Sequence, residues 1–409
     1  MAQTTITAED LLKEFYLPGV RNQLNDEIYF LGEVEKTSED VEGLEAVLSL
    51  RVRRNSGVGA RADGGALPTA GRQSYVKQRV PLKYNYGRIQ VSGPLVAAGK
   101  TDAGSFARPL AQENEGVVAD LKRDVNRQLF GTSDGAIAAC GLTTSSTIIV
   151  MAVGNFSETQ QFQIQEGMKI DIGTVASPTA SYTGLTVASV GTTTITVETT
   201  SVTTATTSII FRSGSGGATS AQKELTGLQT QISSGDALFG VSGTTYGAWN
   251  SYVNGNSGTD RAVTENLFIT AQQSVRRDSG GEIDLWVTTA GVQRQVANLL
   301  QSIKRFPNTL ELKGGYTGID MAAAGAGRSG GKSVALVWDE DCPANTAFGI
   351  STDKFKYHRS SDWDFMDMDG SVLSRVAGYD AYEAVLYQYS ELATDNRGAH
   401  ARLNDLSES

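Results

Sequence analysis

The longest helical pattern in the sequence runs from Thr101 to Gly131. Its apolar residues recur at spacings of three, four and seven, which places them on one stripe of a helix. Asp102 or Ser105 can cap the start. Pro109 delays the regular helix to about its own position, and Gly131 is well placed to end it. We predict a long rod packed along one side, through the side chains of Phe106, Leu110, Val118, Leu121, Val125 and Leu129.

A long β-hairpin is predicted before this helix, over residues 44–100. A strand-like run from Leu44 to Arg54 is followed by a Gly/Ala-rich stretch, 55–74, and by a second strand-like run from Tyr75 to Val91. The Gly/Ala-rich stretch is typical of an exposed loop tip. Because an isolated two-stranded ribbon is marginal in water, the hairpin needs a partner surface.

Charge divides the first hundred residues sharply. Residues 1–50 hold 11 acidic and 3 basic residues, whereas residues 51–100 hold 10 basic residues and one acid, Asp63. The net charge of the whole chain is −10, so a basic segment lies inside an acidic protein. Such a segment fits either a nucleic-acid patch or a surface that docks on copies of the same protein. Its basic residues on the hairpin are Arg51, Arg53, Arg54, Arg61, Arg72, Lys77, Arg79, Lys83 and Arg88.

Composition changes abruptly after the long helix. From Leu142 to Ser220, 30 of 79 residues are Ser or Thr and only 6 are charged. Short β-rich runs alternate there with turn residues, which predicts a small antiparallel β domain, either a sandwich or a barrel. Helical and mixed patterns resume on both sides, so the domain is inserted. Its Ser/Thr surface could bind sugars or a partner, or be a plain solvated surface.

The rest of the chain follows an α/β pattern. A helix is predicted after Thr264 and ends at Gly280, and a second helix carries Val292 and Val296 on its apolar stripe. Residues 307–331 are expected to be mostly loop. Strands are predicted at Ile283–Thr288, Val334–Trp338, Thr346–Ile350, Phe355–His358 and within Ser371–Glu391.

Few residues of the usual catalytic types are present. Cys140 and Cys342 are the only cysteines and lie far apart without a CxxC, which supports neither a disulfide framework nor a zinc site. His358 and His400 are the only histidines, so any His-based catalysis would have to use one of them. No paired-carboxylate, Ser/His/Asp or Cys/His constellation can be built. We predict no catalytic, cofactor-binding or metal-ligating residues.

Two stretches match short motifs in letters but not in context. The letters GAGRSGG, from Gly325, fit GxGxxG, but they precede the predicted strand Val334–Trp338, whereas a dinucleotide-binding loop follows a strand and opens a helix. Four aspartates within 362–369 precede Gly370, but an EF-hand frame on that glycine would begin at Phe365, which cannot ligate calcium. We expect a glycine-rich loop and a solvated turn.

Neither a membrane span nor a secretory signal is predicted. No run of about 18 apolar residues occurs, and the N-terminal letters MAQTTITAEDLLKEF lack a basic region followed by an apolar core. Synthesis in a cytoplasm is therefore expected.

Longer stretches resemble one protein family over nearly the whole chain. They are QLFG from Gln128, KELTGL from Lys223, LKGGYTG from Leu312, DEDCPANT from Asp339 and SDWDFMDMDGSVLSRVAGYDAYEAVLYQYSEL from Ser361. Together they resemble the major capsid proteins of tailed bacteriophages, which have the Hong Kong 97 type capsid fold. The resemblance implies an α+β fold.

The resemblance also implies a domain organisation. It assigns 1–43 to an N-terminal arm, 44–100 to an extended loop lying across a neighbouring subunit, 101–141 to a spine helix and part of the peripheral domain, 142–220 to an inserted β domain, 221–332 to an axial domain, and 333–409 to C-terminal strands of the peripheral and axial domains.

The function implied is structural. Copies of the chain would form hexamers and pentamers of an icosahedral shell around double-stranded DNA held non-specifically, assembled in the host bacterial cytoplasm and residing in the virion. Portal and decoration proteins are the expected partners, with no cofactor and no membrane. The chain lacks the scaffolding extension of some members, which implies a separate scaffolding protein or a processed form. Some members also cross-link Lys to Asn, but nothing in this sequence identifies the partners of such a bond.

Three other interpretations compete with a phage shell. An encapsulin-like compartment would share the fold and house enzymes. A Ser/Thr-rich β module for glycans or cell surfaces would use 142–220 alone and leave the other 330 or so residues without a role. A nucleotide-dependent enzyme would rest only on the glycine-rich loop.

Overall fold

The computed structural model describes eleven segments of the chain: 29–39, 41–53, 55–94, 109–152, 158–198, 200–217, 222–301, 309–311, 317–322, 333–367 and 374–408. Residues 1–28, most of the predicted N-terminal arm, lie outside them, as do Arg54 and Phe106. The described residues divide into two compact units. The first contains residues 84–126 and 360–389, and the second contains residues 29–83, 127–359 and 390–409.

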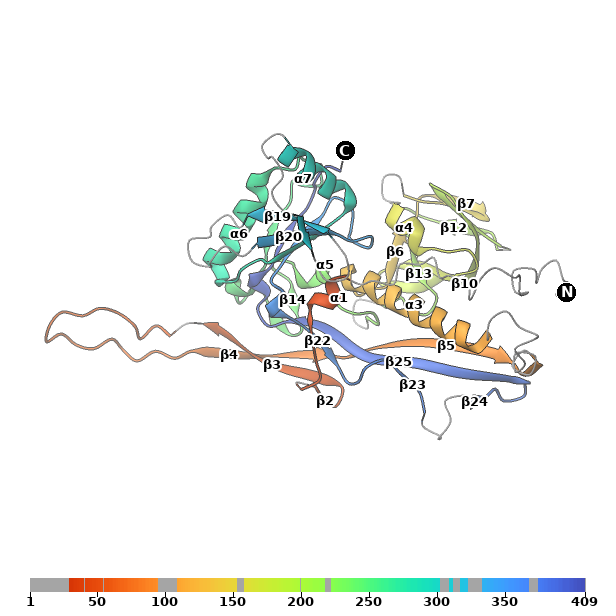
Figure 1. The fold of residues 1–409 in the computed structure, drawn as a ribbon, viewed down its shortest axis with the longest axis horizontal. Coiled ribbons are helices and arrows are strands. Elements are labelled where there is room, and N and C mark those ends of the chain that lie inside the picture. Colours follow the sequence, from red (N-terminus) through yellow and green to blue (C-terminus); the bar gives the residue numbers. More distant parts are fainter. Residues whose placement is uncertain are drawn as a thin grey trace. The chain divides into compact units, whose positions relative to one another are not determined.

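The first unit is a β-ribbon with a long helix along it (Figure 1). Strand β5 (Lys83–Ser92) pairs with β25 (Ala381–Thr394), and two short strands, β23 (Asp364–Phe365) and β24 (Ser374–Arg375), pair antiparallel with β25. Helix α3 (Pro109–Phe130) confirms the predicted rod and its start at Pro109.

The apolar stripe of α3 is buried where the structure describes it. Val118 and Leu121 are half-buried, while Val125 and Leu129 are fully buried, the last within the second unit. The side chain of Leu110 lies outside the described residues.

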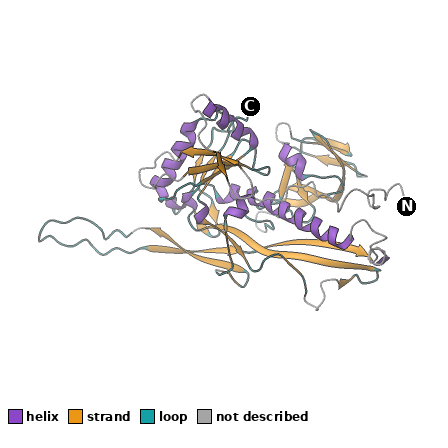
Figure 2. Ribbon diagram, viewed as in Figure 1, coloured by secondary structure: helices purple, strands orange, loops and turns teal. Residues whose placement is uncertain are grey.

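The main sheet of the second unit has seven strands with α6 (Glu265–Ser279) and α7 (Ala290–Gln301) packed on it (Figure 2). Phe268 of α6 meets the indole of Trp286 edge-on, with ring centroids 4.8 Å apart. Gly280 ends α6 as predicted, in the left-handed region at φ 74°, where glycine carries no Cβ penalty. In spatial order the strands are β16 (Tyr252–Asn254), β26 (Ala401–Leu403), β21 (Ala347–Ile350), β17 (Leu285–Thr288), β20 (Ser333–Trp338), β19 (Thr317–Ala322) and β18 (Thr309–Glu311).

The expectation of mostly loop between 307 and 331 was wrong where the structure describes that segment. β18 and β19 form an antiparallel pair there, and β19 pairs in turn with β20. Short polar strands at the edge of a sheet carry too weak a period-2 pattern to be distinguished from loop in a sequence.

The Ser/Thr-rich segment forms a closed β-barrel. Its sheet runs β6 (Ala136–Ala139), β13 (Ile209–Arg212), β9 (Lys169–Thr174), β10 (Ser177–Val190), β11 (Thr194–Val197) and β8 (Ile148–Val150). The two ends of this sheet meet, because Cys140 and Met151 form an isolated antiparallel β-bridge. Gly141 N–H donates to the Val150 carbonyl at 2.8 Å, and Ala152 N–H donates to the Ala139 carbonyl at 3.0 Å. Closure removes the exposed sheet edges that would promote aggregation.

The barrel begins earlier than predicted, at β6 rather than at residue 142. The small alanine-rich run at 136–139 has little strand propensity, but Ile137 and Cys140 are buried in the barrel core. The other elements of this domain are α4 (Glu158–Gln163) and the antiparallel pair β7 (Thr143–Ser146) and β12 (Val202–Thr204).

Many of the barrel's polar side chains bond its own backbone. Thr143 Oγ1 accepts from Val150 N–H at 2.9 Å, and Ser146 Oγ accepts from Ile148 N–H at 3.0 Å, so hydroxyls bind the outward N–H groups of β8. The buried carboxylate of Asp171 accepts from Gly184 and Gly214. Part of the Ser/Thr content is therefore structural, because a buried or edge amide without an acceptor is costly.

A cluster of aromatic rings fills the second unit beside β22 (Phe355–Arg359), which pairs with β25 and with β1 (Glu35–Thr37). Phe30 of α1 (Tyr29–Glu33) packs against Phe130 and Phe355, with ring centroids about 6 Å apart. His400, after the short helix η5 (Arg397–Ala399), stacks on Phe355 at 4.2 Å, and η4 (Thr352–Lys354) precedes β22.

The predicted long hairpin is shorter than expected. β3 (Glu45–Arg53) pairs antiparallel with β4 (Ser74–Pro81), and β2 (Val41–Glu42) extends this ribbon. The second predicted strand is broken at Leu82, after which β5 pairs with β25 instead of β3. Lys83 and Arg88 therefore lie on β5, outside the hairpin. A residue pattern predicts strands but not which strand each one pairs with.

β5 approaches α3 closely at Gly87, which provides a test of that packing. A Cβ there would lie 2.5 Å from Leu121 Cδ1 and 2.7 Å from Val117 Cγ1. We expect Gly87→Ala to lower the free energy of unfolding by about 1–3 kcal/mol, because both side chains must move. Denaturant unfolding measures the change.

Gly116 supplies the matched control on the same helix, since a Cβ there meets nothing within 4 Å. Gly116→Ala should instead raise the free energy of unfolding by about 0.5–1 kcal/mol, through the entropy of the unfolded chain. Equal effects of the two substitutions would contradict the close packing of β5 on α3.

Candidate functional site: the β3–β4 hairpin

One face of the hairpin, here called the outer face, is exposed and basic. Burial alternates along both strands, so odd-numbered residues point outward and even-numbered ones inward. The register places Val47 opposite Arg79, Ser49 opposite Lys77 and Arg51 opposite Tyr75. The outer face consists of Glu45, Val47, Ser49, Arg51, Arg53, Tyr75, Lys77 and Arg79.

Positive charge on the outer face exceeds what the chain neutralises. Arg79 Nη1 pairs with Glu45 Oε1 at 2.6 Å, an exposed contact worth about 0–1 kcal/mol. Among the described residues, Arg51, Arg53 and Lys77 form no ion pair. Tyr75 is 60% exposed and Val47 is 40% exposed. A face with free cations and exposed apolar groups is suited to an acidic protein surface.

The inner face anchors the hairpin to the second unit. Leu50 is buried against Leu238, Val241 and Trp249. Arg79 N–H donates to the Phe239 carbonyl at 3.3 Å. These contacts come from β14 (Ala237–Leu238), β15 (Val241–Ser242) and the short helix η2 (Gly247–Trp249). Burying one leucine stabilises by about 1.5–3 kcal/mol, so several such contacts hold the base of the ribbon firmly.

The anchor is positioned by the buried side chain of Arg397. Its Nε donates to the Gln231 carbonyl at 2.8 Å, its Nη1 to the Asp236 carbonyl at 2.8 Å and its Nη2 to the Thr230 carbonyl at 3.1 Å. These carbonyls lie at the end of α5 (Leu228–Gln231) and on the loop leading to β14. Burial lowers the pKa of Arg397 to about 10, so it remains charged at neutral pH.

The tip of the hairpin, residues 55–73, has a narrow neck and an exposed end. A Cβ on Gly57 would lie 2.7 Å from Gly71 N, so only glycine lets the two legs approach this closely. Beyond the neck, Val58 and Leu67 are 83% and 86% exposed. Arg61 and Arg72 are exposed on the same tip.

The structure places eight of the nine predicted basic residues, in three settings. Four share the outer face, Arg61 and Arg72 lie on the tip, and Arg54 lies outside the described residues. The remaining two have partners elsewhere: Lys83 Nζ donates to the Gln222 carbonyl at 2.6 Å, and Arg88 Nε donates to Glu383 Oε2 at 3.0 Å. These two lie outside the β3–β4 hairpin, because β5 belongs to another sheet, and a role for them in subunit contacts stays a prediction.

Residues 222–228, which contain KELTGL and are here called the clasp, are held by buried polar groups. Arg127 forms an ion pair with Glu224 at 2.5 Å, with both side chains less than a tenth exposed. Leu225 N–H donates to Gln128 Oε1 at 3.1 Å. Thr226 N–H donates to Glu391 Oε1 at 2.7 Å. The clasp thus joins the end of α3 to β25 within the second unit.

Glu391 of β25 binds the clasp through a buried carboxyl with a perturbed pKa. Burial raises its pKa to about 8, against the opposing effects of the Thr226 N–H bond and the nearby Lys83 charge. At neutral pH the group is therefore largely protonated. In the sequence, the only sign of this buried carboxyl is a single glutamate within an apolar strand.

The two histidines and two cysteines are all buried. Burial lowers the pKa of His400 to about 3, so the ring is neutral, with Ser351 N–H donating to its Nδ1 at 3.2 Å. Burial raises the pKa of both thiols. In the described segments no group of three or more His, Cys, Asp or Glu could hold a metal ion. No helix in those segments is long and apolar enough to cross a membrane. The glycine-rich loop from Gly325 lies outside them.

Sequence reasoning found the basic residues but missed their arrangement. The alternation of polar and apolar letters from Glu45 to Arg53 could have assigned Arg51 and Arg53 to one face. The anchor residues Leu238, Val241 and Trp249 had no such signal, because their segment is short and rich in turns.

Comparison with known proteins identifies the fold. No protein-family model matches the chain, and no curated protein matches its sequence. Among solved structures, the chain is similar to the capsid asymmetric unit of cyanophage A-1(L), with a TM-score of 0.60, 15% identity and coverage of 98% of this chain and 99% of that one. The capsid of a native GTA particle matches with a TM-score of 0.50, 11% identity and 99% coverage of both chains.

An encapsulin is also similar. The SrpI encapsulin complex of Synechococcus elongatus PCC 7942 matches with a TM-score of 0.50, 9% identity and coverage of 100% of this chain and 97% of that one. The chain therefore has a capsid-like α+β fold, the class seen in shell-forming proteins.

The buried carboxyl of Glu391 gives a pH-dependent prediction. Its pKa is raised in the folded state, so its contribution to stability is present below about pH 4.5 and is lost as the pH rises toward 8. Glu391→Gln keeps the shape and removes the titration. The free energy of unfolding of the variant minus that of the wild type should therefore rise between those pH values, by at most about 1.4 kcal/mol per pH unit. Urea unfolding at several pH values measures the difference.

Glu391→Ala serves as the comparison, since it leaves Thr226 N–H without its acceptor and should destabilise the protein at every pH. Parallel pH profiles for the wild type and Glu391→Gln would show that Glu391 does not hold its proton in the folded state.

Proposed function

We propose that the chain is the major capsid protein of a tailed bacteriophage, which self-assembles into hexamers and pentamers of an icosahedral shell around double-stranded DNA. The observation that carries this proposal is the match to a phage capsid subunit over nearly the full length of both chains. This match includes both the barrel and the long hairpin. A binding module made of 142–220 alone would leave the hairpin without a role.

Under this proposal, the main structural elements of the chain correspond to parts of a capsid subunit. The long helix α3 is the spine of the peripheral domain, and the β3–β4 hairpin is the extended loop over a neighbouring subunit. The seven-stranded sheet with α6 and α7 is the axial domain around the capsomer centre. The closed barrel is the inserted domain, and residues 1–28 belong to the N-terminal arm.

The outer face of the hairpin would supply the contact between subunits. Its free cations and Tyr75 meet an acidic surface on the next copy, as the net charge of −10 favours. Such a contact joins two different surfaces, so repetition closes rings when the rotation between copies permits. Each exposed ion pair contributes only about 0–1 kcal/mol, so stability comes from many copies together.

Other partners follow from a shell of this kind. A separate scaffolding protein, a portal and a decoration protein would act on it, and the packaged DNA would be held non-specifically by inner Lys and Arg residues. The shell would assemble in the host bacterial cytoplasm and reside in the virion. We propose no catalytic role.

An encapsulin-like compartment is the second candidate, favoured by the similarity to the SrpI encapsulin. Purified particles distinguish the two: double-stranded DNA inside supports the phage shell, and packaged enzyme supports the compartment.

Charge reversal on the hairpin tests the proposed function. We expect the variant carrying Arg72→Glu, Lys77→Glu and Arg79→Glu to remain folded and fail to form rings or shells, because the positive charge of these exposed side chains meets acidic groups of the next copy on assembly. The exposed pair of Arg79 with Glu45 is lost as well, at a cost of only about 0–1 kcal/mol. Light scattering after size exclusion and negative-stain electron microscopy measure assembly. Wild-type assembly should weaken with added salt, since the Debye length falls to about 10 Å at 0.1 M.

A control variant carries the same change in net charge on exposed lysines outside the hairpin: Lys36→Glu, Lys122→Glu and Lys169→Glu. Assembly of the hairpin variant at all salt concentrations would refute the role of the outer face. A wild-type chain that stays monomeric with its scaffolding protein would refute the shell itself.

A further inference from the structure

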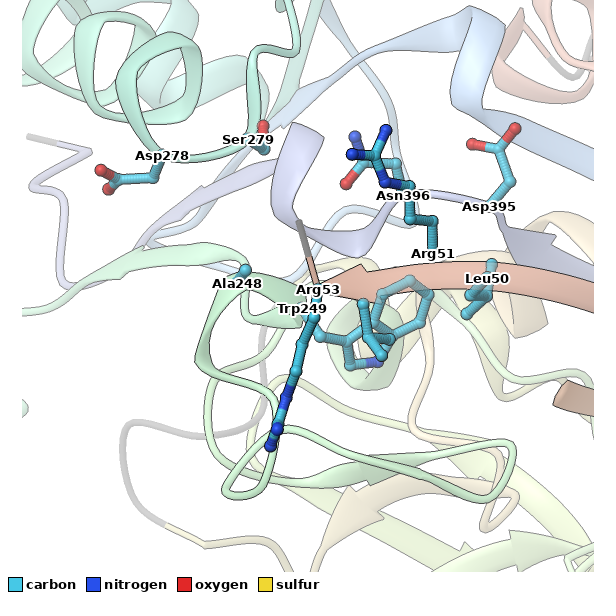
Figure 3. A pocket seen from close by; sticks show the side chains of 10 residues that line it. Leu50, Arg51, Arg53, Ala248, Trp249, Asp278, Ser279, Asp395 and Asn396 are labelled. Carbon is cyan, nitrogen blue, oxygen red and sulfur yellow. The ribbon is translucent and has the colours of Figure 1, made fainter. Parts of the chain in front are cut away.

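A polar pocket lies where the hairpin leaves the body of the second unit (Figure 3). Its volume is about 380 Å³, within the range of about 300–1,000 Å³ typical of ligand pockets. Leu50, Val52 and Trp249 supply its apolar part, and Asp278 and Asp395 come from two different walls. The pocket therefore combines an apolar floor with carboxylates placed apart.

Within the described residues, the charged groups around the pocket are only partly neutralised. The carboxylate of Asp395 accepts no hydrogen bond and forms no ion pair with any described residue, although the charges of Lys354 and Lys356 attract it. Arg51, which extends toward Asn396, also forms no ion pair among these residues. Asp278, at the C-terminal end of α6, is exposed and pairs only with its neighbour Arg277, at 2.7 Å. The pocket thus offers both signs of charge to an incoming group.

The tip of the hairpin has complementary chemistry. Leu67 is 86% exposed, a strong exposure for a leucine on a loop. Arg61 and Asp63 carry opposite charges two residues apart, as the pocket carries Asp395 and Arg51. The Gly57/Gly71 neck keeps the tip slender enough to enter a cavity.

We propose that this pocket receives the hairpin tip of a second copy of the chain. Leu67 packs on Leu50 and Trp249, Arg61 meets Asp395, and Asp63 meets Arg51. The chain's own tip cannot reach, because residues 55–73 run away from the body beyond the end of β3 (Figure 1). This inference rests on the proposed function, since it names the place on the next subunit where the tip binds.

The position of the pocket, as well as its charge, indicates that a second copy of the chain binds there. Arg51 belongs both to the outer face and to the pocket, so the pocket continues the surface already proposed to bind a neighbour. One chain then carries a tip and a receptor for a tip. Head-to-tail repetition of that contact forms a ring or a linear chain of subunits.

Two single-cysteine variants test the contact directly. The native thiols are fully buried, so Leu67→Cys on one full-length protein and Ala248→Cys on another are the accessible ones. Ala248 lines the pocket and is exposed. The two proteins are mixed under assembly conditions and oxidised, and cross-linked dimers are measured by non-reducing gel electrophoresis. We expect the mixed dimer to form at least about tenfold faster than with a control, as a bound tip has a high effective concentration.

The matched control replaces an exposed alanine far from the pocket in the chain fold, Ala176→Cys on the barrel turn after β9. Charge reversal provides a second test. Arg61→Glu on the protein that carries Leu67→Cys should slow the cross-link, and Asp395→Lys on the protein that carries Ala248→Cys should restore its rate. Equal rates for the pocket and control cysteines would overturn the inference.

Assembly is followed in parallel by electron microscopy, which separates the two proposals. Rings or shells without the Leu67–Ala248 cross-link would reject the pocket as receptor and leave the shell function intact. Absence of any assembly would reject both.

Discussion

The second unit depends on one buried polar segment, the clasp at 222–228. Here the chain leaves the barrel and passes between the end of α3 and the end of β25. Two polar contacts hold it, the ion pair of Arg127 with Glu224 and the hydrogen bonds from Thr226 to Glu391. A Cβ on Gly227 would clash with the Gln128 carbonyl, so the segment fits only with glycine at that point.

Burying charge in this way stabilises little by itself, because desolvation offsets most of the attraction. The benefit of such a contact is that it requires one particular geometry. A carboxylate paired with an arginine and an amide fixes one position of the clasp, whereas an apolar contact would allow several. The same logic applies to Arg397, whose guanidinium binds three carbonyls and so positions the floor beneath the hairpin. Rigid placement of the hairpin base is what makes its exposed face useful to a partner.

Local elements were predictable from the sequence, and their pairings were not. The stripe on α3, the stop at Gly280 and three of the seven strands of the main sheet (β17, β20 and β21) follow from residue period and from glycine, because these signals lie within a few residues of each other. The pairing of β5 with β25 joins residues about 300 positions apart, and nothing local encodes it. The basic residues of the site were likewise visible in the sequence. The register of strand pairing was needed to assign them to the hairpin, the tip or β5. It was also needed to find that Glu391 is buried.

The closure of the barrel has a consequence for how the chain can vary. Its first and last strands leave the barrel side by side: Gly217 N–H donates to the Asp134 carbonyl at 3.1 Å, and a Cβ on Gly135 would lie 3.0 Å from the Ser215 carbonyl. The chain therefore enters and leaves the barrel at one narrow junction, and α4 adds a contact through Gln163 Nε2, which donates to Asp341 Oδ1 at 2.8 Å. A domain joined in this way can be exchanged, enlarged or deleted without lengthening any path through the host fold, since the two chain ends already lie within hydrogen-bonding distance.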